Sequence, residues 1–288
     1  MYQATAPLLT PSGTDTQHSA PLRLARVVHR AFGPGESRID DEFSTRHFTD
    51  IAGAYGRDYR PDLAPGGTGN TFATMSRELV EALGPDAAEI QVAVVGHVTP
   101  DLDCRSAATT YLSDAWPAGP LAFGVSEQGC CTPLTALRLA QAYAARHGLE
   151  RALVLLLDQA TLPYETGRRL AGDAGIALLL NRTGTLAVPE PRVLPGVAAE
   201  RVRDTLAEQL ADIGPTTLLV GPGIDPDRDL PAGSAAHRSA TGFPAVGLWA
   251  DLAASAELPL RRPAALIDRD PDSGDLAICL LRPTPDSA

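Results

Sequence analysis

The chain has 288 residues, 44% of them hydrophobic, with 35 acidic and 24 basic side chains and a formal net charge of -11. This length and hydrophobic content allow a substantial buried core, so we expect one large α/β domain or two fused halves that fold without disulfides. Nucleic acid is not an expected partner, because binding to a phosphate backbone requires clustered Lys and Arg residues, which the sequence lacks.

The four cysteines, Cys104, Cys130, Cys131 and Cys279, follow no spacing typical of a zinc site or a disulfide framework. A bridge between the adjacent Cys130 and Cys131 would be strained. We therefore expect free thiols in a reducing, cytoplasmic compartment, and we expect no metal or other cofactor. The N-terminus has no basic start followed by an apolar stretch, and no run approaches about 18 apolar residues, so we expect neither secretion nor a membrane span.

The N-terminal quarter of the chain mixes readable and unreadable segments. Residues 1–20 are rich in Ser, Thr and Pro and have no periodicity, which predicts a disordered tail. Alternating apolar residues predict a half-buried strand over 22–32. Charges mixed with Pro and Gly over 33–70 indicate a loop with one short helix.

A regular alternation of helices and strands follows. Residues 74–84 place apolar side chains on one helical face and end in Gly84. The later alternation predicts a mostly parallel sheet covered by helices, and it recurs in shortened form after the Pro-rich segment 188–196. We expect two halves, residues 21–184 and 185–288. The predicted strands are 91–96, 120–126, 152–157, 175–180, 216–220, 263–268 and 275–282, and the predicted helices are 104–113, 133–147, 198–212 and 244–255.

The chemistry is concentrated in PLAFGVSEQGCCTPLTALRLAQAYAARHG, residues 120–148, which predicts a strand, a Gly-Cys-Cys turn and a helix. Thr132 is the predicted N-cap and Pro133 the first helical residue. Cys130 and Cys131 then lie beside a helix N-terminus, where unpaired N–H groups and the positive end of the dipole lower the pKa of a thiol and can hold an oxyanion. The pattern suits thioester chemistry. The alternative is that both cysteines are small core residues.

The same segment resembles the β-ketoacyl-ACP synthase III branch of the thiolase superfamily, in which a strand beginning Ala-Phe leads to the acyl-accepting cysteine and an Ala-Leu pair follows. Here these are Ala122-Phe123, Cys130 and Ala136-Leu137. Counting back from Ala136-Leu137, the family's spacing selects Cys130. Counting forward from Ala122-Phe123 leaves one extra residue, so Cys131 stays an alternative. The blocks ALVLLLDQA and GDAGIALLL follow in the family's order. The resemblance implies a thiolase-like fold of two pseudo-repeated βα halves in α-β-α-β-α layers.

The departures from the family concern its two assisting residues, a His and an Asn of the C-terminal half that serve decarboxylation of a malonyl thioester. Where the His motif should follow TTLLV, the chain has Gly221-Pro222-Gly223, and no Asn occurs in residues 182–288. His237 is the only His in the C-terminal half and lies within a few residues of the expected Asn. It is a candidate base, or alternatively an exposed loop residue.

Two further side chains are candidates for the site. His97 ends the strand QVAVVGH, and α/β proteins place their sites at the carboxyl ends of strands. Its alternative role is to cap the sheet edge. Glu127 lies just before the cysteines, where a carboxylate would raise the pKa of a thiol and can act as a base. Its alternative is a solvated turn residue.

The resemblance implies an acyltransferase, and the composition together with the divergence from housekeeping members suggests a setting in bacterial specialised metabolism of polyketide or fatty-acyl chains. Cys130 would take an acyl group from an ACP or CoA thioester and pass it to an alcohol, an amine or a second thiol. Two alternatives remain: a catalytically silent ketosynthase-like subunit, and a decarboxylating ketosynthase with atypical residues, which the missing His and Asn disfavour. The family also implies a homodimer, or a heterodimer with a homologous ketosynthase.

Overall fold

The computed structural model describes residues 20–115, 119–167, 170–189, 191–211, 213–214, 216–231, 233–254 and 262–284. The predicted disordered tail, residues 1–20, lies outside the described residues except for Ala20. Within the described part of the chain, no helix is long and apolar enough to cross a membrane.

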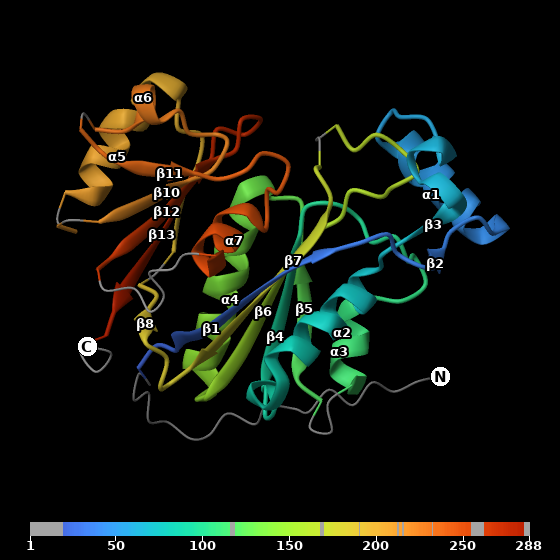
Figure 1. Ribbon diagram of the computed structural model, residues 1–288, viewed down its shortest axis with the longest axis horizontal. Coiled ribbons are helices and arrows are strands. Elements are labelled where there is room, and N and C mark those ends of the chain that lie inside the picture. The colour runs from blue at the N-terminus through green and yellow to red at the C-terminus, as the bar shows by residue number, and fades with distance from the viewer. Residues whose placement is uncertain are drawn as a thin grey trace.

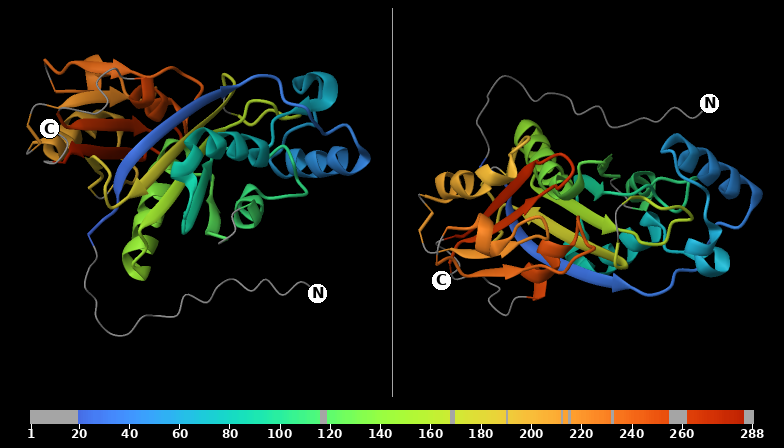
Figure 2. Two further views of the ribbon diagram at one scale, coloured as in Figure 1. Left: turned by 60° about the horizontal axis from the view of Figure 1, so that its bottom comes forward. Right: turned by 90° about the horizontal axis from the view of Figure 1, so that it is seen from above.

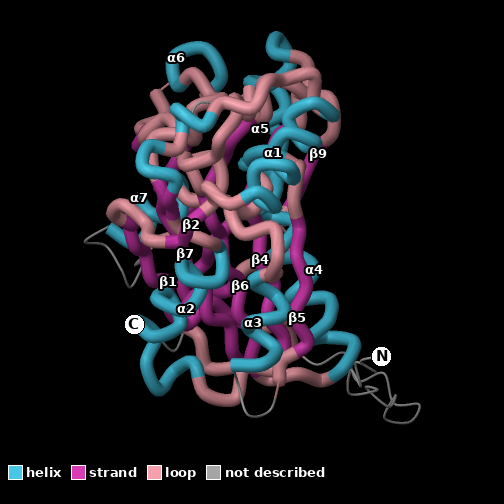
Figure 3. Tube along the Cα trace, turned by 90° about the vertical axis from the view of Figure 1, so that its right-hand side faces the viewer, coloured by secondary structure: helices cyan, strands magenta, loops and turns pink. Residues whose placement is uncertain are grey.

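Eleven of the described strands form one large sheet, with helices between its two groups of strands and on their outer faces (Figures 1 and 3). The spatial order is β11-β10-β12-β13-β8-β1-β7-β6-β4-β5, and β9 pairs with β13 beside this path. A separate pair consists of β2 and β3. The bounds are β1 Arg23–Phe32, β2 Ser37–Arg38, β3 Thr68–Gly69, β4 Val92–His97, β5 Leu121–Val125, β6 Arg151–Asp158, β7 Asp173–Asn181, β8 Leu186–Ala187, β9 Arg192–Leu194, β10 Thr217–Val220, β11 Ala236–Arg238, β12 Ala264–Arg269 and β13 Leu276–Pro283.

The two halves of this sheet repeat one topology. The first half runs β1-β7-β6-β4-β5 and the second β9-β13-β12-β10-β11, so each half places its five strands in the same order. The directions of corresponding pairs also agree. The short β8 pairs with both β1 and β13 and joins the halves. The prediction of two pseudo-repeated halves is confirmed.

The prediction of a mostly parallel sheet was wrong for part of each half. β4 is parallel to β5 and β6, but β7 is antiparallel to both β6 and β1. Parallel neighbours require a crossover connection, usually a helix. The described residues between β6 and β7 contain no helix, so the chain turns back and pairs antiparallel.

The helices cover the sheet in layers. α4 and α7, which follow β5 and β11, contribute to one core together with strands of both halves, and Figure 1 shows them between the two groups of strands. α2 and α3 pack on the outer face of the first half, and α5 packs on the outer face of the second. These are the predicted α-β-α-β-α layers. The bounds are α1 Glu42–Ala54, α2 Phe72–Leu83, α3 Ala108–Ala115, α4 Thr132–His147, α5 Val202–Leu210, α6 Pro226–Asp229 and α7 Gly247–Ala254.

The segment 33–70 is more structured than predicted. It contains the 13-residue helix α1 as well as β2 and β3. Asp41 caps α1, because its side chain accepts a hydrogen bond from the backbone N–H of Ser44 at 3.1 Å. Phe48 is fully buried against residues from loops distant in sequence, including Leu102 and Tyr164. Tertiary packing therefore stabilises α1, a helix that the local sequence pattern does not predict at this length.

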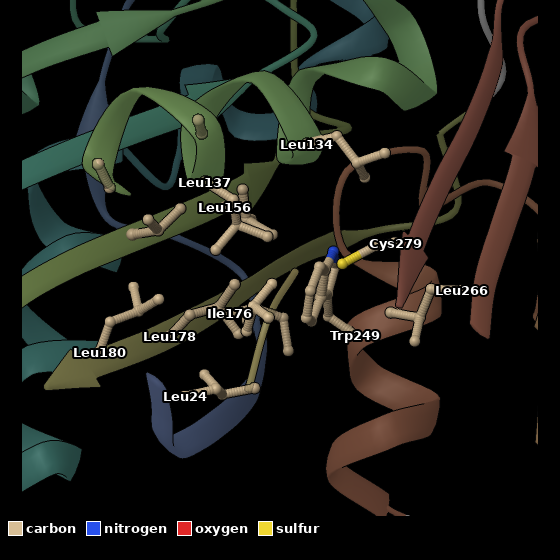
Figure 4. Close-up of a cluster of buried hydrophobic side chains, with 14 of the residues drawn as sticks. Leu24, Leu134, Leu137, Leu156, Ile176, Leu178, Leu180, Trp249, Leu266 and Cys279 are labelled. Carbon is tan, nitrogen blue, oxygen red and sulfur yellow. The ribbon is translucent and has the colours of Figure 1, made fainter. Parts of the chain in front are cut away.

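The central core joins the halves through side chains from both (Figure 4). Leu137 and Ile176 from the first half share this cluster with Trp249, Leu266 and Cys279 from the second. β1 extends from the second-half strands toward α1 (Figure 2), so it also spans the molecule. The start of α4 lies where these parts meet.

Candidate active site

The Gly-Cys-Cys turn forms a short 3-10 turn, Gly129–Cys131, directly before α4. The backbone N–H of Cys131 donates to the carbonyl oxygen of Gln128 at 2.9 Å. The prediction of Thr132 as N-cap was wrong: Thr132 is the first helical residue, and its buried hydroxyl has no hydrogen-bond partner among the described residues. The extra 3-10 turn moves the helix start, so Cys131 stands at the cap position, where its side chain makes no capping hydrogen bond to the helix.

Cys130 is 7% exposed and surrounded by groups that oppose its ionisation. Its hydrogen bond with the Cys131 thiol, its burial and the nearby carboxyls of Asp268 and Asp270 all raise the pKa of the Cys130 thiol well above its ordinary value. The expectation of a lowered thiol pKa was therefore wrong for Cys130. A helix N-terminus favours a thiolate only modestly, and here burial and two carboxyls outweigh it.

Asp268, the penultimate residue of β12, is the group that the sequence analysis missed. Its Oδ1 accepts from the backbone N–H groups of Gly223 at 2.9 Å and Arg269 at 2.8 Å. Burial raises the pKa of Asp268 to about 6, while these hydrogen bonds and one from the Cys130 thiol oppose the rise. Asp268 is thus a buried carboxyl that titrates near neutrality beside the candidate nucleophile.

The Gly-Pro-Gly segment makes room for this carboxyl. A side chain at Gly221 would place its Cβ 2.1 Å from Cγ of Asp268, and one at Gly223 would meet the Arg269 carbonyl oxygen at 1.8 Å. Two features of the sequence could have predicted the role of Asp268. Glycines stand where the family has its His motif, and an Asp ends the apolar run of a predicted strand. Asp268 occupies the space that these glycines leave.

A second aspartate occupies the corresponding place in the other half. Asp158 ends β6 as Asp268 closes the apolar run of β12, and its carboxyl accepts from the backbone N–H groups of Ala245 at 3.1 Å and Val246 at 2.9 Å, just before α7. Burial raises the pKa of Asp158 to about 7. Each half therefore contributes one buried aspartate, which lies at the start of the other half's central helix, α4 or α7. Of these two aspartates, Asp268 is the one that has a cysteine as a neighbour among the described residues.

His97 lies at the end of β4, as predicted, and its ring packs against Phe72 with 4.8 Å between centroids. Its Nδ1–H donates to the carbonyl oxygen of Thr99 at 2.6 Å, since a carbonyl can only accept. Burial lowers the pKa of His97, and Glu127 is close enough to oppose this shift. A neutral ring with Nε2 free to accept is the form expected of a general base.

His237 is placed away from this group. It lies on β11, its side chain is exposed, and its Nε2 is 3.6 Å from Oδ1 of Asp251 on α7. Among the described residues, no hydrogen bond or ion pair joins His237 to Cys130 or Cys131. Its role as a base for the thiol stays a prediction without a supporting contact.

Cys131 is 2% exposed, and its Sγ lies 3.9 Å from the carbonyl oxygen of Asp275. It is thus as enclosed as Cys130 but points to a backbone carbonyl. Cys279 is fully buried in the core, where burial raises its pKa to about 12. The thiol of Cys130 lies beside the carboxyl of Asp268 and hydrogen-bonds to it.

Glu127 faces a cavity of about 310 Å³ beside the nucleophile turn. Its Oε1 accepts a hydrogen bond from the hydroxyl of Tyr55 at 2.9 Å. Gly129, the residue bonded to Cys130, also lines this cavity. The residues lining the cavity are Tyr55, Arg57, Val98, Thr99, Pro100, Glu127, Gly129, Tyr164, Glu165 and Thr166.

No protein-family model matches the chain, and no curated protein sequence matches it significantly. Solved structures do match it over nearly its whole length. They include AbyA1, a tetronic acid condensing enzyme, with a TM-score of 0.60 and 16% identity over 91% of this chain and 99% of that chain. The 3-oxoacyl-[acyl-carrier-protein] synthase III of Aquifex aeolicus VF5 matches with a TM-score of 0.58 and 13% identity over 91% and 99%. ChlB3, described as an acyltransferase, matches with a TM-score of 0.58 and 14% identity over 92% and 98%. The chain therefore has the thiolase-type fold of β-ketoacyl-ACP synthase III-like proteins.

Proposed function

We propose that the protein is an acyltransferase in which Cys130 captures an acyl group from an ACP or CoA thioester and passes it to an acceptor. The observation that carries the proposal is the buried pair of Cys130 and Asp268 at the start of α4. Similarity in fold to a condensing enzyme and to an acyltransferase supports acyl chemistry. Specialised bacterial metabolism of polyketide or fatty-acyl chains is the setting that we infer.

Asp268 replaces the missing histidine in this proposal. As Sγ of Cys130 attacks the thioester carbonyl carbon, Asp268 accepts the thiol proton and later returns it to the leaving carrier thiolate. The new C–S bond thus replaces the old one without net consumption of a proton. This reaction forms no enolate, so it does not need the family's His and Asn.

A second candidate is a catalytically silent subunit that pairs with a homologous ketosynthase. The raised pKa of the Cys130 thiol favours it, because burial and two carboxyls keep the thiol protonated. A protonated, enclosed thiol reacts only if a base acts on it during the attack. The two candidates therefore differ in whether Asp268 activates Cys130.

The deciding experiment incubates the protein with acyl-CoA and acyl-ACP donors and follows the acyl mass increment by intact mass and peptide mapping. We expect an adduct on Cys130 that is lost in Cys130→Ala and forms about 100-fold more slowly in Asp268→Asn, the usual range for losing a general base. The capture rate of the wild type should rise as the pH passes through about 6, because Asp268 must be ionised to accept the proton.

Asp158→Asn is the matched control, because it removes the corresponding buried carboxyl at the start of the other central helix. Its capture rate should keep the wild-type pH profile. No adduct with any donor would favour the silent subunit. Equal capture rates in Asp268→Asn and the wild type would remove Asp268 from the mechanism, and an adduct confined to Cys131 would move the nucleophile by one residue.

A further inference from the structure

The cavity beside the nucleophile turn is large enough for a small molecule. Its volume is about 310 Å³, at the lower end of ligand pockets. It lies between the residues that follow α1, the loop after β4, the turn before Cys130 and the loop 164–166. Because Gly129 forms part of its wall, a molecule held there lies next to the backbone of Cys130.

Glu127 is held in this wall by an unusual backbone. Its φ is 62°, in the left-handed region that side-chain-bearing residues seldom adopt. Tyr55 fixes the carboxylate through its hydroxyl at 2.9 Å. Such conformations persist where the surrounding structure enforces them, and they concentrate at functional sites.

Tyr164 gives an independent sign of a missing ligand. The residue is only 4% exposed and lines the cavity, yet its hydroxyl has no hydrogen-bond partner among the described residues. Buried hydroxyls are normally paired, so an unpaired one in a cavity wall marks a place for a ligand atom. Burial, with Tyr55 and Glu127 nearby, raises the pKa of Tyr164 to about 12, so the group offered is a neutral hydroxyl.

The charges of the wall indicate the sign of this ligand. Glu127 and Glu165 contribute two carboxylates, and Arg60, 3.9 Å from Glu165, lies outside the wall. Arg57 is the cation among the lining residues, and its Nη2 lies toward Gly167, at the far end of the 164–167 loop. The carboxylate of Glu127 and the neutral hydroxyl of Tyr164, both from the lining of the cavity, can accept hydrogen bonds, which suits a donor with positive charge.

We propose that this cavity binds the acceptor of the transfer reaction, that the acceptor is a small primary amine, and that Glu127 and Tyr164 hold it as its ammonium form. The transfer reaction in this inference rests on the proposed function, whereas the binding of the amine does not. Tyr55 is a positioning residue, since it acts by fixing the carboxylate of Glu127.

The transfer step follows from this arrangement. Glu127 takes one proton from the ammonium, and the neutral amine attacks the acyl carbonyl carbon on Cys130. The C–N bond forms as the C–S bond breaks, and the second amine proton returns Cys130 to its thiol form. The products are an amide, the free thiol and a protonated Glu127 that releases its proton to water, so the step needs no oxidant or other co-reactant.

Titration calorimetry with propylammonium tests the binding without any acyl donor, with propanol and propionate as probes of equal size. We expect saturable binding of propylammonium, weaker binding of propanol and none of propionate. Glu127→Gln should weaken propylammonium binding at least about tenfold, since it removes a charge-assisted hydrogen bond. Tyr164→Phe should weaken it by a smaller factor.

Glu89→Gln is the matched control. Glu89 shares the φ of 62° but lies outside the cavity wall, so its replacement should leave binding unchanged. Absent propylammonium binding, equal binding in Glu127→Gln, or tighter binding of propionate would each overturn the inference.

Release of the acyl group gives the second readout. Propylamine should speed the loss of the acyl mass from loaded Cys130 and yield the N-propyl amide, and the rate per loaded protein should fall about 100-fold in Glu127→Gln. A protein that binds propylammonium but never loads Cys130 contradicts the proposed function alone. A protein that loads Cys130 but does not release it to the amine contradicts the inference alone.

Discussion

At the scale of single residues, the site is defined by what surrounds a thiol more than by the thiol itself. Cys130 stands at a helix N-terminus, a setting associated with reactive thiolates, yet its neighbours keep it protonated. In the proposed mechanism, the reactivity of Cys130 depends on the carboxyl of Asp268, which has a pKa of about 6. Asp158, the corresponding aspartate of the other half, is also buried and accepts hydrogen bonds from the backbone N–H groups of Ala245 and Val246.

Asp158 gives a prediction about stability and pH. Its folded pKa of about 7 is raised above the ordinary 3.8, so the folded state binds its proton more tightly than the unfolded chain. Its contribution to stability is greatest below about pH 4 and is lost as the pH rises through about 7. From about pH 4 to about pH 8, the free energy of unfolding of the wild type should fall by about 3 kcal/mol relative to Asp158→Asn.

Urea unfolding of both proteins at the two pH values measures this difference. Asn keeps an oxygen that can accept from the N–H groups of Ala245 and Val246, so the variant isolates the ionisation. Other titrating groups, including Asp268, are common to both proteins and cancel. A gap between the two proteins that does not change with pH would show that Asp158 is not the titrating group.

The sequence could predict those residues of the site that lie close together along the chain, but not those that meet only in the folded molecule. The turn, Cys130 and Glu127 belong to one short segment, so strand, turn and helix signals place them together. Asp268 and Tyr55 reach the same place from other parts of the chain through the tertiary fold. Nothing in local periodicity encodes such contacts. The structure alone also shows that His237 turns to Asp251.

At the scale of elements, Gly221 and Gly223 leave the space that the carboxyl of Asp268 fills. The backbone N–H of Gly221 donates to the carbonyl oxygen of Ile267 at 2.8 Å, so this segment cannot easily move away. Any side chain at Gly221 must therefore displace the carboxyl that it would touch.

We predict that Gly221→Ala lowers the free energy of unfolding by about 1–3 kcal/mol, the range for overpacking a filled site. Much of this cost should vanish in the Asp268→Ala background, because the colliding atoms are then absent. A double-mutant cycle by urea unfolding measures the coupling, which should reach about 1 kcal/mol or more. Gly53→Ala, in α1 with open space around it, is the control and should stabilise the protein by up to about 1 kcal/mol. A coupling near zero would mean that the segment yields and Asp268 stays in place.

The prediction of a strand from the sequence was correct where a run of apolar residues is also buried along its length. The run Arg151–Asp158 is buried over nearly its whole length between helical layers, so an unbroken apolar segment reports a strand correctly. The direction of β7 was not predictable in this way, because periodicity carries no information on parallel or antiparallel pairing. α1 was missed because its buried side chains, Phe48 among them, find partners only in the folded molecule.

At the scale of the whole molecule, the two halves with repeated topology share one hydrophobic core. Trp249 of α7 is 1% exposed in a core that also contains Leu137 of α4 and Ile176 of β7 (Figure 4). β8 joins the strands of both halves, and Asp158 ties β6 to the start of α7. Neither half can expose this core without leaving the other half's apolar side chains in water.

We therefore predict that both halves unfold in a single cooperative transition and that Trp249→Ala lowers the free energy of unfolding by about 3–5 kcal/mol, as expected for a large aromatic side chain removed from a core. The far-ultraviolet circular dichroism and hydrogen exchange of β4 and β12 should give one urea midpoint in the wild type and one lower midpoint in the variant. Phe43→Ala is the control, since Phe43 is 57% exposed, and should cost less than about 1 kcal/mol. If Trp249→Ala loosened β12 while β4 kept its wild-type midpoint, the halves would be separate units that merely touch. The contacts that Asp158 and Asp268 make between the two halves would then form only after each half has folded. These contacts would be expected to weaken while the half that contains Cys130 stays folded.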